Sequence, residues 1–295
     1  MTAARRRNET GARISYQPVN TPILEKDLPS IVPQSPAERI AIIIPACNEE
    51  ACLGAVLEEL LAVIDPKKFV VAVGVNNSSD RSAEIAREYP VSVTETSERG
   101  YGYGCQAAID AVTRAEPSIS AYVFFAGDGA SDPHDVAQLA AAYEQGFGLV
   151  LGARTMRRSN WRVMSFPHVL ANFSLGLWCG LLSGQLFRDL APLRLIERNL
   201  FEALALQEMT FGWTIEAQVG AALRGASICE VTAHERARLG GEQKVSGVTW
   251  GRTFSIGCRI LAAGWRARRR FRQAAQVETR APATANLLAP SQPGA

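Results

Sequence analysis

The sequence predicts a doubly wound α/β fold, in which a mainly parallel sheet has helices on both faces. Short apolar runs, such as 39–45 (RIAIIIP) and 69–75 (FVVAVGV), are typical of strands buried on both sides. Segments with the apolar period of a helix separate these runs. Strands that alternate with helices imply right-handed crossovers within one parallel sheet.

The expected elements follow one another from residue 39 onward. After the first strand, five apolar residues recur at helical spacing: Leu53, Val56, Leu57, Leu60 and Leu61. Further strands are expected at 91–96, 121–126 and 148–154, and further helices at 78–89 and 102–115. Asp132 is expected to cap the helix that contains Val136 and Leu139, with Pro133 at its first position.

The composition changes at both ends of the chain. Residues 1–38 are polar and carry five prolines with little periodicity, which predicts a disordered N-terminal arm. We expect one domain over 39–265, followed at 266–295 by a basic segment and a disordered tail rich in Ala, Pro and Thr.

Composition limits the class of protein. The net charge of +2 over 295 residues is too small to argue for nucleic-acid binding, so no nucleic-acid partner is expected. The six cysteines form no CxxC pair and no zinc spacing with the three histidines, which favours buried thiols in a reducing compartment. The N-terminal arginines precede no apolar stretch, so we expect a cytoplasmic protein rather than a secreted one.

Two segments raise the question of a membrane. Residues 163–187 carry no full charge, but Pro167, Asn172 and Gln185 interrupt them, which favours a buried or interface-lying helix over a spanning one. Residues 251–272 mix many arginines with apolar side chains: Ile256, Ile260, Leu261, Trp265 and Phe271. Such a basic amphipathic helix predicts peripheral contact with an anionic membrane surface, whereas nucleic-acid binding needs a broader basic face.

Polar or glycine-rich loops follow four successive strands. They are 45–50 (PACNEE), 76–80 (NNSSD), 98–104 (ERGYGYG) and 126–132 (AGDGASD). In doubly wound sheets, ligands bind outside the carboxyl ends of the strands. The four loops therefore predict one binding site at that edge.

The order and spacing of these motifs resemble glycosyltransferase family 2, together with FGWTIEAQVGAALRG (211–225) and RLGGEQKVSG (238–247). Within that family the chain looks closest to the transferases that load sugars onto polyprenyl or dolichyl phosphate. The resemblance covers about residues 39–265. It implies a GT-A fold, a sugar-nucleotide donor, a divalent metal and inversion at the anomeric carbon.

The resemblance assigns the metal and the donor diphosphate to an Asp-x-Asp pair at the end of the fourth strand. Here the second position is Asp128, which becomes the expected metal ligand and catalytic residue, while Ala126 replaces the first. Mg²⁺ or Mn²⁺ is expected, because both prefer carboxylate and phosphate oxygens. The simpler alternative for Asp128 is a turn residue.

The same resemblance places Pro45, Asn48 and Glu49 against the base and ribose of the donor. The structural alternative for Asn48 and Glu49 is a helix entry, where acidic side chains are favourable. Asn76 is expected to hydrogen-bond the donor, although Val75 stands where many relatives carry aspartate.

Three cations complete the expected donor site. Arg99 lies beside glycines that permit close backbone approach to a diphosphate, with a surface arginine as the alternative. Arg238 and Lys244 flank two glycines in a loop suited to closing over the diphosphate. The alternative for that loop is a solvated basic segment.

Two further carboxylates are candidates for catalysis. The resemblance puts Glu216 beside the acceptor, where it is a general base if the acceptor is a hydroxyl, whereas an anionic phosphate acceptor needs none. Its structural alternative is a tether for Arg194 or another arginine. Asp189 either meets the sugar or acceptor, or forms a structural ion pair.

The sequence therefore predicts an inverting hexosyltransferase that uses a UDP- or GDP-sugar and a polyprenyl phosphate or other lipid-soluble acceptor. Since Ala126 and Val75 replace two acidic positions common in relatives, the alternative is a non-catalytic sugar-nucleotide-binding protein. A sugar-phosphate nucleotidyltransferase needs a basic, glycine-rich loop after the first strand, and the acidic PACNEE counts against it.

Overall fold

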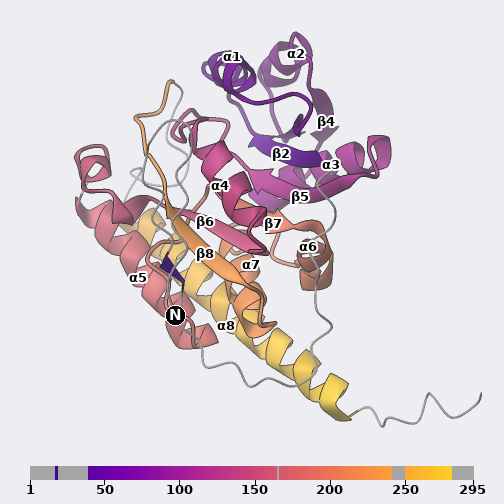
Figure 1. The fold of residues 1–295 in the computed structure, drawn as a ribbon. Helices are drawn as coiled ribbons and strands as arrows, with labels where there is room; N and C mark the ends of the chain where they lie inside the picture. The colour runs from indigo at the N-terminus through magenta and orange to yellow at the C-terminus, as the bar shows by residue number, and fades with distance from the viewer. Residues whose placement is uncertain (1–16, 19–38, 165, 241–249, 281–295) are drawn as a thin grey trace, which may run out of the picture.

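The computed structural model describes residues 17–18, 39–164, 166–240 and 250–280. In this part of the chain, eight strands form one sheet in the order β1-β8-β6-β7-β5-β2-β3-β4 (Figure 1). The strands are β1 (Gln17–Pro18), β2 (Arg39–Ala46), β3 (Phe69–Asn76), β4 (Ser92–Thr96), β5 (Ile119–Phe124), β6 (Leu149–Ala153), β7 (Arg194–Glu197) and β8 (Ile228–Thr232).

The strand directions confirm the predicted mainly parallel sheet. β4, β3, β2 and β5 run parallel, as do β6 and β8. β7, which the sequence analysis did not identify, lies antiparallel between β5 and β6. Because two antiparallel pairings restore the original direction, β5 and β6 point the same way and end at one edge of the sheet.

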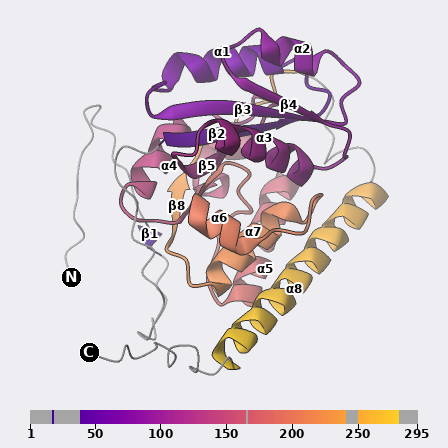
Figure 2. The same cartoon turned by 90° about the vertical axis from the view of Figure 1, so that its right-hand side faces the viewer.

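Helices cover both faces of the sheet (Figure 2). One face carries α1 (Leu53–Val63), α2 (Ser82–Arg87) and α4 (Asp135–Tyr143). The other carries α3 (Tyr101–Ala115), α6 (Arg198–Leu204) and α7 (Trp213–Leu223), with α5 (Phe166–Ser183) and α8 (Trp250–Arg280) packed outside α7. Two 3₁₀ turns, η1 (Arg154–Met156) and η2 (Arg158–Arg162), connect β6 to α5.

The strand β2 shows why its sequence is a continuous apolar run. Ile40, Ile42 and Ile44 face the helices α1, α2 and α4, whereas Ala41 and Ile43 face the layer of α3 and α7. All five side chains are buried. A strand with a helix layer on each side needs apolar residues at every position rather than at alternate ones.

Several element boundaries differ from the predictions. α2 spans Ser82–Arg87 rather than 78–89, and β5 spans Ile119–Phe124 rather than 121–126. α4 begins at Asp135 rather than after Asp132, because the Asp132 carboxylate and carbonyl accept the backbone N–H groups of His134 and Asp135 and form a turn first. Helix α8 runs through the expected domain boundary at 265/266. The arm predicted at 1–38 lies outside the described residues, apart from β1.

Cysteine and membrane predictions are also addressed by the structure. All six cysteines are free thiols, and four of them are buried: Cys52, Cys105, Cys179 and Cys229. Burial, with help from Glu49, raises the pKa of Cys52 to about 12, so this thiol stays protonated and inert at neutral pH.

Among the described residues, no helix combines the length and apolar character needed to cross a bilayer.

Gly74 tests the packing of β3 against α3. A Cβ at Gly74 would lie 1.9 Å from the carbonyl oxygen of Gly104, so Gly74→Ala must push strand and helix apart. We expect the free energy of unfolding, measured by chemical denaturation, to fall by about 2–3 kcal/mol.

Gly257 in α8 provides the matched control. A Cβ there meets no atom within 4 Å, so Gly257→Ala should leave stability unchanged or raise it by up to about 1 kcal/mol. Equal stability of the Gly74→Ala protein and the wild type would contradict the described contact.

Candidate active site

The loops that follow β2, β3 and β5 are joined at the predicted edge of the sheet. Backbone N–H of Asn48 donates to Ser78 Oγ at 2.9 Å, and Asn48 Oδ1 accepts the N–H of Ser79 at 2.7 Å. Asn48 has a φ of +53°, a left-handed conformation that asparagine tolerates better than most residues. Cys52 Sγ reaches the carbonyl of Gly127 at 3.5 Å, which connects the third loop.

The first turn of α1 is fixed by the loop after β3. Ser82 Oγ accepts the backbone N–H of Glu49 at 2.8 Å, and Asp80 accepts that of Glu50 at 2.9 Å. Ser82 Oγ in turn donates to Asp80 at 2.6 Å. Asp80 therefore acts as a structural residue at the entry to α2.

Arg238 connects Glu49, another predicted donor residue, with the predicted metal ligand Asp128. Its Nη1 lies 2.9 Å from Asp128 Oδ2, and its Nη2 lies 3.0 Å from Glu49 Oε2. Asp128 Oδ1 accepts the N–H of Ala130 at 3.0 Å, and the Asp128 carbonyl accepts that of Leu239 at 3.1 Å. The structure thus brings Glu49, Asp128 and Arg238 together, and we call these three residues the Arg238 cluster.

The loop after β4 meets the same edge through the start of α3. Asn76 is buried, and its Nδ2 donates to the carbonyl of Gly100 at 3.1 Å. Gly100 has a φ of +154°, and a Cβ there would lie 2.4 Å from the Met209 carbonyl, so only glycine fits. Asn76 is therefore a positioning residue for this loop in the structure.

Of the other predicted donor residues, Pro45 and Arg99 lie in different surroundings and do not join the Arg238 cluster. Pro45 lies in β2, opposite Gly74 in the register with β3. Arg99 is exposed beside the α3 start. Lys244 lies outside the described residues.

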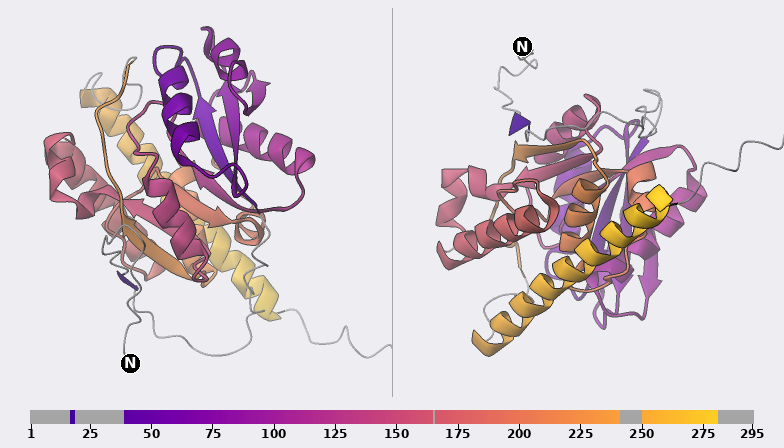
Figure 3. Two further views of the ribbon diagram at one scale, coloured as in Figure 1. Left: turned by 45° about the horizontal axis from the view of Figure 1, so that its top comes forward. Right: turned by 90° about the horizontal axis from the view of Figure 1, so that it is seen from below.

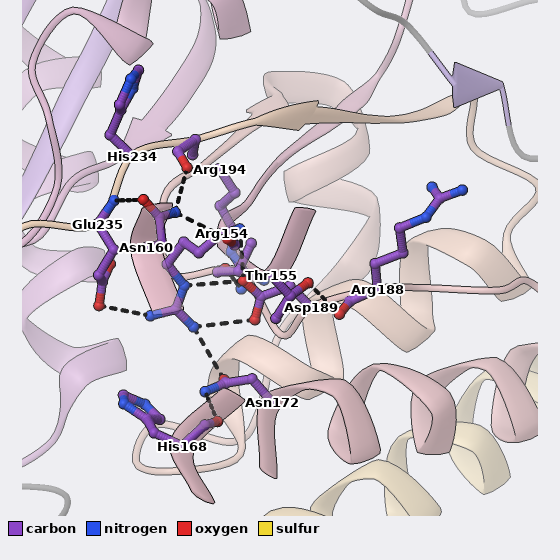
Figure 4. A network of polar contacts seen from close by, with 12 residues as sticks. Arg154, Thr155, Asn160, His168, Asn172, Arg188, Asp189, Arg194, His234 and Glu235 are labelled. Atoms are coloured by element: carbon purple, nitrogen blue, oxygen red, sulfur yellow. Dashed lines mark hydrogen bonds and ion pairs between the residues drawn. The ribbon is translucent and has the colours of Figure 1, made fainter. Parts of the chain in front are cut away.

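Asp189 forms a buried ion pair with Arg154 (Figure 4). Asp189 Oδ2 accepts the Arg154 backbone N–H at 2.9 Å and its Nε at 3.0 Å, while Oδ1 accepts Nη2 at 3.1 Å. Asp189 has no exposed surface. This is the structural ion pair that the sequence left open as the alternative to a catalytic role.

The guanidinium of Arg154 also reaches two other segments of the chain. It donates to Asn172 Oδ1 in α5 at 3.0 Å and to Glu235 Oε1 beyond β8 at 3.2 Å (Figure 4). Burial lowers the pKa of Arg154, but the carboxylates of Asp189 and Glu235 outweigh burial and raise it above its ordinary value. Glu235 also forms a β-bridge with Ser131, which lies in the loop that carries Asp128.

Glu216 is likewise engaged by structural partners. Its Oε2 accepts the backbone N–H groups of Gln207 and Glu208 at 2.9 and 2.8 Å, and its Oε1 pairs with Arg270 of α8 at 3.0 Å. The side chain is buried. The arginine that it tethers is therefore Arg270, whereas Arg194 donates to the carbonyls of Thr214 and Ala191.

Sequence reasoning missed Arg154 and Glu235. Arg154 directly follows a strand that is buried along its whole length, and a charged residue at such a point is a usable signal for a buried partner. Glu235 gave no comparable signal, because its role depends on the pairing of β8 with β6 and on the bridge to Ser131.

Few side chains at the site could ligate a metal ion. Within the described part of the chain, no group of three or more His, Cys, Asp or Glu side chains could hold a cation. Asp128 is the carboxylate at the β5 end, and its side chain is 22% exposed. Magnesium commonly binds one or two protein carboxylates and completes its shell with substrate phosphates and water. Asp128 fits that mode of binding.

Two curated relatives align over most of the chain. An uncharacterised glycosyltransferase of Mycobacterium tuberculosis is 28% identical over 74% of this chain and 95% of its own length. A dolichyl-phosphate hexose transferase of Haloferax volcanii is 28% identical over 68% of this chain and 84% of its own.

Solved structures share the fold. A glucosyl-3-phosphoglycerate synthase of M. tuberculosis, solved with Mn²⁺, UDP-glucose and glycerol 3-phosphate, superposes with a TM-score of 0.57 at 17% identity. The match covers 78% of this chain and 80% of the synthase. It confirms the predicted GT-A-like architecture.

The family model described as "Glycosyl transferase family 2" matches residues 41–199, more than half of the chain. That span begins in β2 and includes the Asp128 loop, the buried Arg154–Asp189 pair and the antiparallel strand β7. The chain belongs to glycosyltransferase family 2.

Proposed function

We propose that the chain is an inverting hexosyltransferase. It moves the sugar of a UDP- or GDP-linked donor to a polyprenyl phosphate or another lipid-soluble phosphate acceptor. The dolichyl-phosphate hexose transferase of H. volcanii supports the acceptor class. The synthase structures with UDP-glucose and phosphoglyceric acid support a nucleotide-sugar donor and a phosphate-bearing acceptor.

The Arg238 cluster is the single observation that carries this proposal. A cation lies between two carboxylates where β2 and β5 end. A nucleoside diphosphate brings negative charge that the Arg238 guanidinium can bind with two N–H groups. Asp128, released from Arg238, then becomes available to a divalent cation. The positive charges of Arg238 and the cation offset the negative charges of the diphosphate and Asp128.

Mg²⁺ or Mn²⁺ is part of the proposal. Asp128 would hold the ion together with the donor diphosphate. The synthase structure that contains both Mn²⁺ and UDP-glucose supports the use of a divalent cation with the donor. The ion would stabilise negative charge on the leaving diphosphate. Arg238 would supply a second positive charge beside the same oxygens.

The state of Glu216 favours a phosphate acceptor over a hydroxyl. A hydroxyl needs a base to take its proton, and Glu216 is buried with both oxygens held by backbone amides and Arg270. A phosphate acceptor is already anionic and needs no such base. We therefore infer that Glu216 and Asp189 are positioning residues rather than groups that meet the substrate.

We further propose that the protein works at the cytoplasmic face of a membrane, where it is held peripherally. A lipid-soluble acceptor has its phosphate at the bilayer surface, so the transferase must reach that surface. The basic helix α8 supports this location.

The direct test uses purified full-length protein, sugar nucleotides, Mg²⁺ or Mn²⁺, and polyprenyl phosphate in detergent. We expect release of nucleoside diphosphate and a lipid-linked sugar for one donor. Donor binding by calorimetry without release or transfer for any donor would instead support the alternative, a non-catalytic sugar-nucleotide-binding protein.

Asp128→Asn should lower the turnover rate by about 10²–10³-fold, the usual effect of losing one charge-stabilising group. The free energy of unfolding should fall by no more than about 1–2 kcal/mol, because the Asp128–Arg238 pair is only partly buried and the asparagine oxygen can still accept the N–H of Ala130. Asp110→Asn on the exposed face of α3 is the control and should retain full turnover. Retained turnover in Asp128→Asn would refute the metal assignment.

Arg238→Gln should weaken donor binding by roughly 10- to 100-fold, because charged hydrogen bonds contribute about 1.5–3 kcal/mol. Calorimetric titration with UDP- and GDP-sugars measures the change. Arg87→Gln, which removes an exposed arginine paired with Glu95, should bind the donor like wild type. An unchanged dissociation constant for Arg238→Gln removes this residue from the donor site.

Asp189→Asn should leave the buried Arg154 charge without its main partner and lower the free energy of unfolding by about 3–5 kcal/mol. Denaturant titration measures the loss, and turnover is measured at low temperature per folded molecule. We expect turnover of the folded fraction to stay close to wild type. Normal stability with abolished turnover would restore the catalytic assignment of Asp189.

A further inference from the structure

Helix α5 carries an exposed apolar stripe on its outer side. Phe166 is 71% exposed and Leu181 is 65% exposed, and between them lie Leu170, Phe173 and Leu177. Their spacing of three or four residues places all five on one face of the helix. We call these five residues the α5 face. Large apolar side chains gathered in this way on a soluble domain indicate an interaction site.

The opposite side of α5 is part of the protein core. Cys179 and Leu182 are buried in the core cluster that also contains residues of α7 and α8. α5 therefore already packs against α7 and α8 through its other side, and the α5 face is not needed to hold the helix in the fold. The exposed apolar side chains are therefore additional to those that α5 uses to pack against the core.

A groove of about 400 Å³ lies beside the α5 face. Most of its lining side chains are apolar, and the lining residues that carry a hydroxyl or a charge are Thr155 and Arg188. The apolar lining comes from Met156, Trp161, Phe166, Val169, Leu170, Phe173, Leu177, Leu186 and Phe187. Thr155 is the second residue after the carboxyl end of β6, so the groove starts near the sheet edge that holds Asp128.

Helix α8 extends the same surface (Figure 3, right). Trp178 Nε1 of α5 donates to the Leu261 carbonyl of α8 at 3.3 Å, so the two helices are in contact. Leu261 and Trp265 are exposed. Phe271, an apolar residue of the predicted amphipathic segment, is instead buried. The main apolar contact surface is thus on α5, and α8 contributes mostly charge.

The exposed charged side chains of these two segments are arginines. Residues 145–188 and 250–276 contain no acidic residue. Several of their arginines are paired with carboxylates from elsewhere in the chain: Arg154 with Asp189, Arg188 with Glu230, Arg266 with Glu208 and Arg270 with Glu216. Arg158 and Arg162 are exposed just before α5, and Arg259, Arg269 and Arg272 are exposed along α8. A positive border around an apolar face complements an anionic lipid surface.

From this arrangement we infer that the α5 face and the arginine-rich side of α8 form a docking surface for an anionic lipid bilayer. The side chains of α5 enter the acyl boundary while the arginines meet the head groups. A nucleic acid matches the charge but not the apolar stripe, and a second copy of the chain would bring like charges together. The inference deepens the proposed function, which requires access to a lipid acceptor.

The test is vesicle flotation with the full-length protein. Vesicles of phosphatidylcholine mixed with phosphatidylglycerol should bind the wild type, and phosphatidylcholine alone should bind it at least about tenfold less. The triple variant Leu170→Gln, Phe173→Gln and Leu177→Gln should lose about tenfold or more of the binding to mixed vesicles. Val63→Gln, at an exposed apolar residue of α1, is the control and should bind like wild type.

A second variant separates charge from apolar contact. Arg259→Gln, Arg269→Gln and Arg272→Gln together should weaken binding to mixed vesicles by about 100-fold. Circular dichroism and donor titration should show that both variants stay folded.

Three outcomes overturn the inference: no binding of the wild type to mixed vesicles, unchanged binding of the α5 variant, or a concentration-dependent dimer that the α5 variant abolishes without any vesicle binding. Failure of the proposed function looks different. Vesicle binding would then be normal, while no donor supports transfer to a short-chain prenyl phosphate in detergent. The α5 variant should retain that transfer, since the short acceptor needs no bilayer.

Discussion

The buried pair of Arg154 and Asp189 is the interaction on which this arrangement depends. Arg154 stands where β6 ends, and its guanidinium contacts Asp189 before β7, Asn172 in α5 and Glu235 after β8. A buried charge is costly unless every hydrogen-bonding group is matched. The need to satisfy Arg154 therefore fixes α5 and the β8 loop against the edge of the sheet that carries Asp128.

That constraint relates the proposed docking surface to the proposed donor site. The groove beside α5 begins one residue after Arg154, and Glu235 at the other end of the network is bridged to the Asp128 loop. A nucleotide at the Arg238 cluster and an acceptor arriving from a bilayer would meet at one edge. Two antiparallel pairings through β7 make this geometry possible, because they align β6 with β5.

Much of the fold was predictable from local pattern. The run 39–45 and the helix face of Leu53, Val56 and Leu57 depend only on which side chains are buried. β7 was missed, because four residues carry too little periodicity to reveal a strand between two others. The partners of Asp189 and Glu216 were open alternatives in the sequence, since ion pairing across 35 or 54 positions depends on topology rather than on local pattern.

Ala126 is consistent with the same chemistry. A second carboxylate at that position would add negative charge beside Glu49 and Asp128, where Arg238 is the cation that contacts both. A donor diphosphate supplies oxygens of the kind that such a carboxylate would offer to a metal. One aspartate, one arginine and the substrate can therefore complete the proposed charge arrangement. An anionic acceptor also removes the need for a free base, which leaves Glu216 to hold α7 against α8.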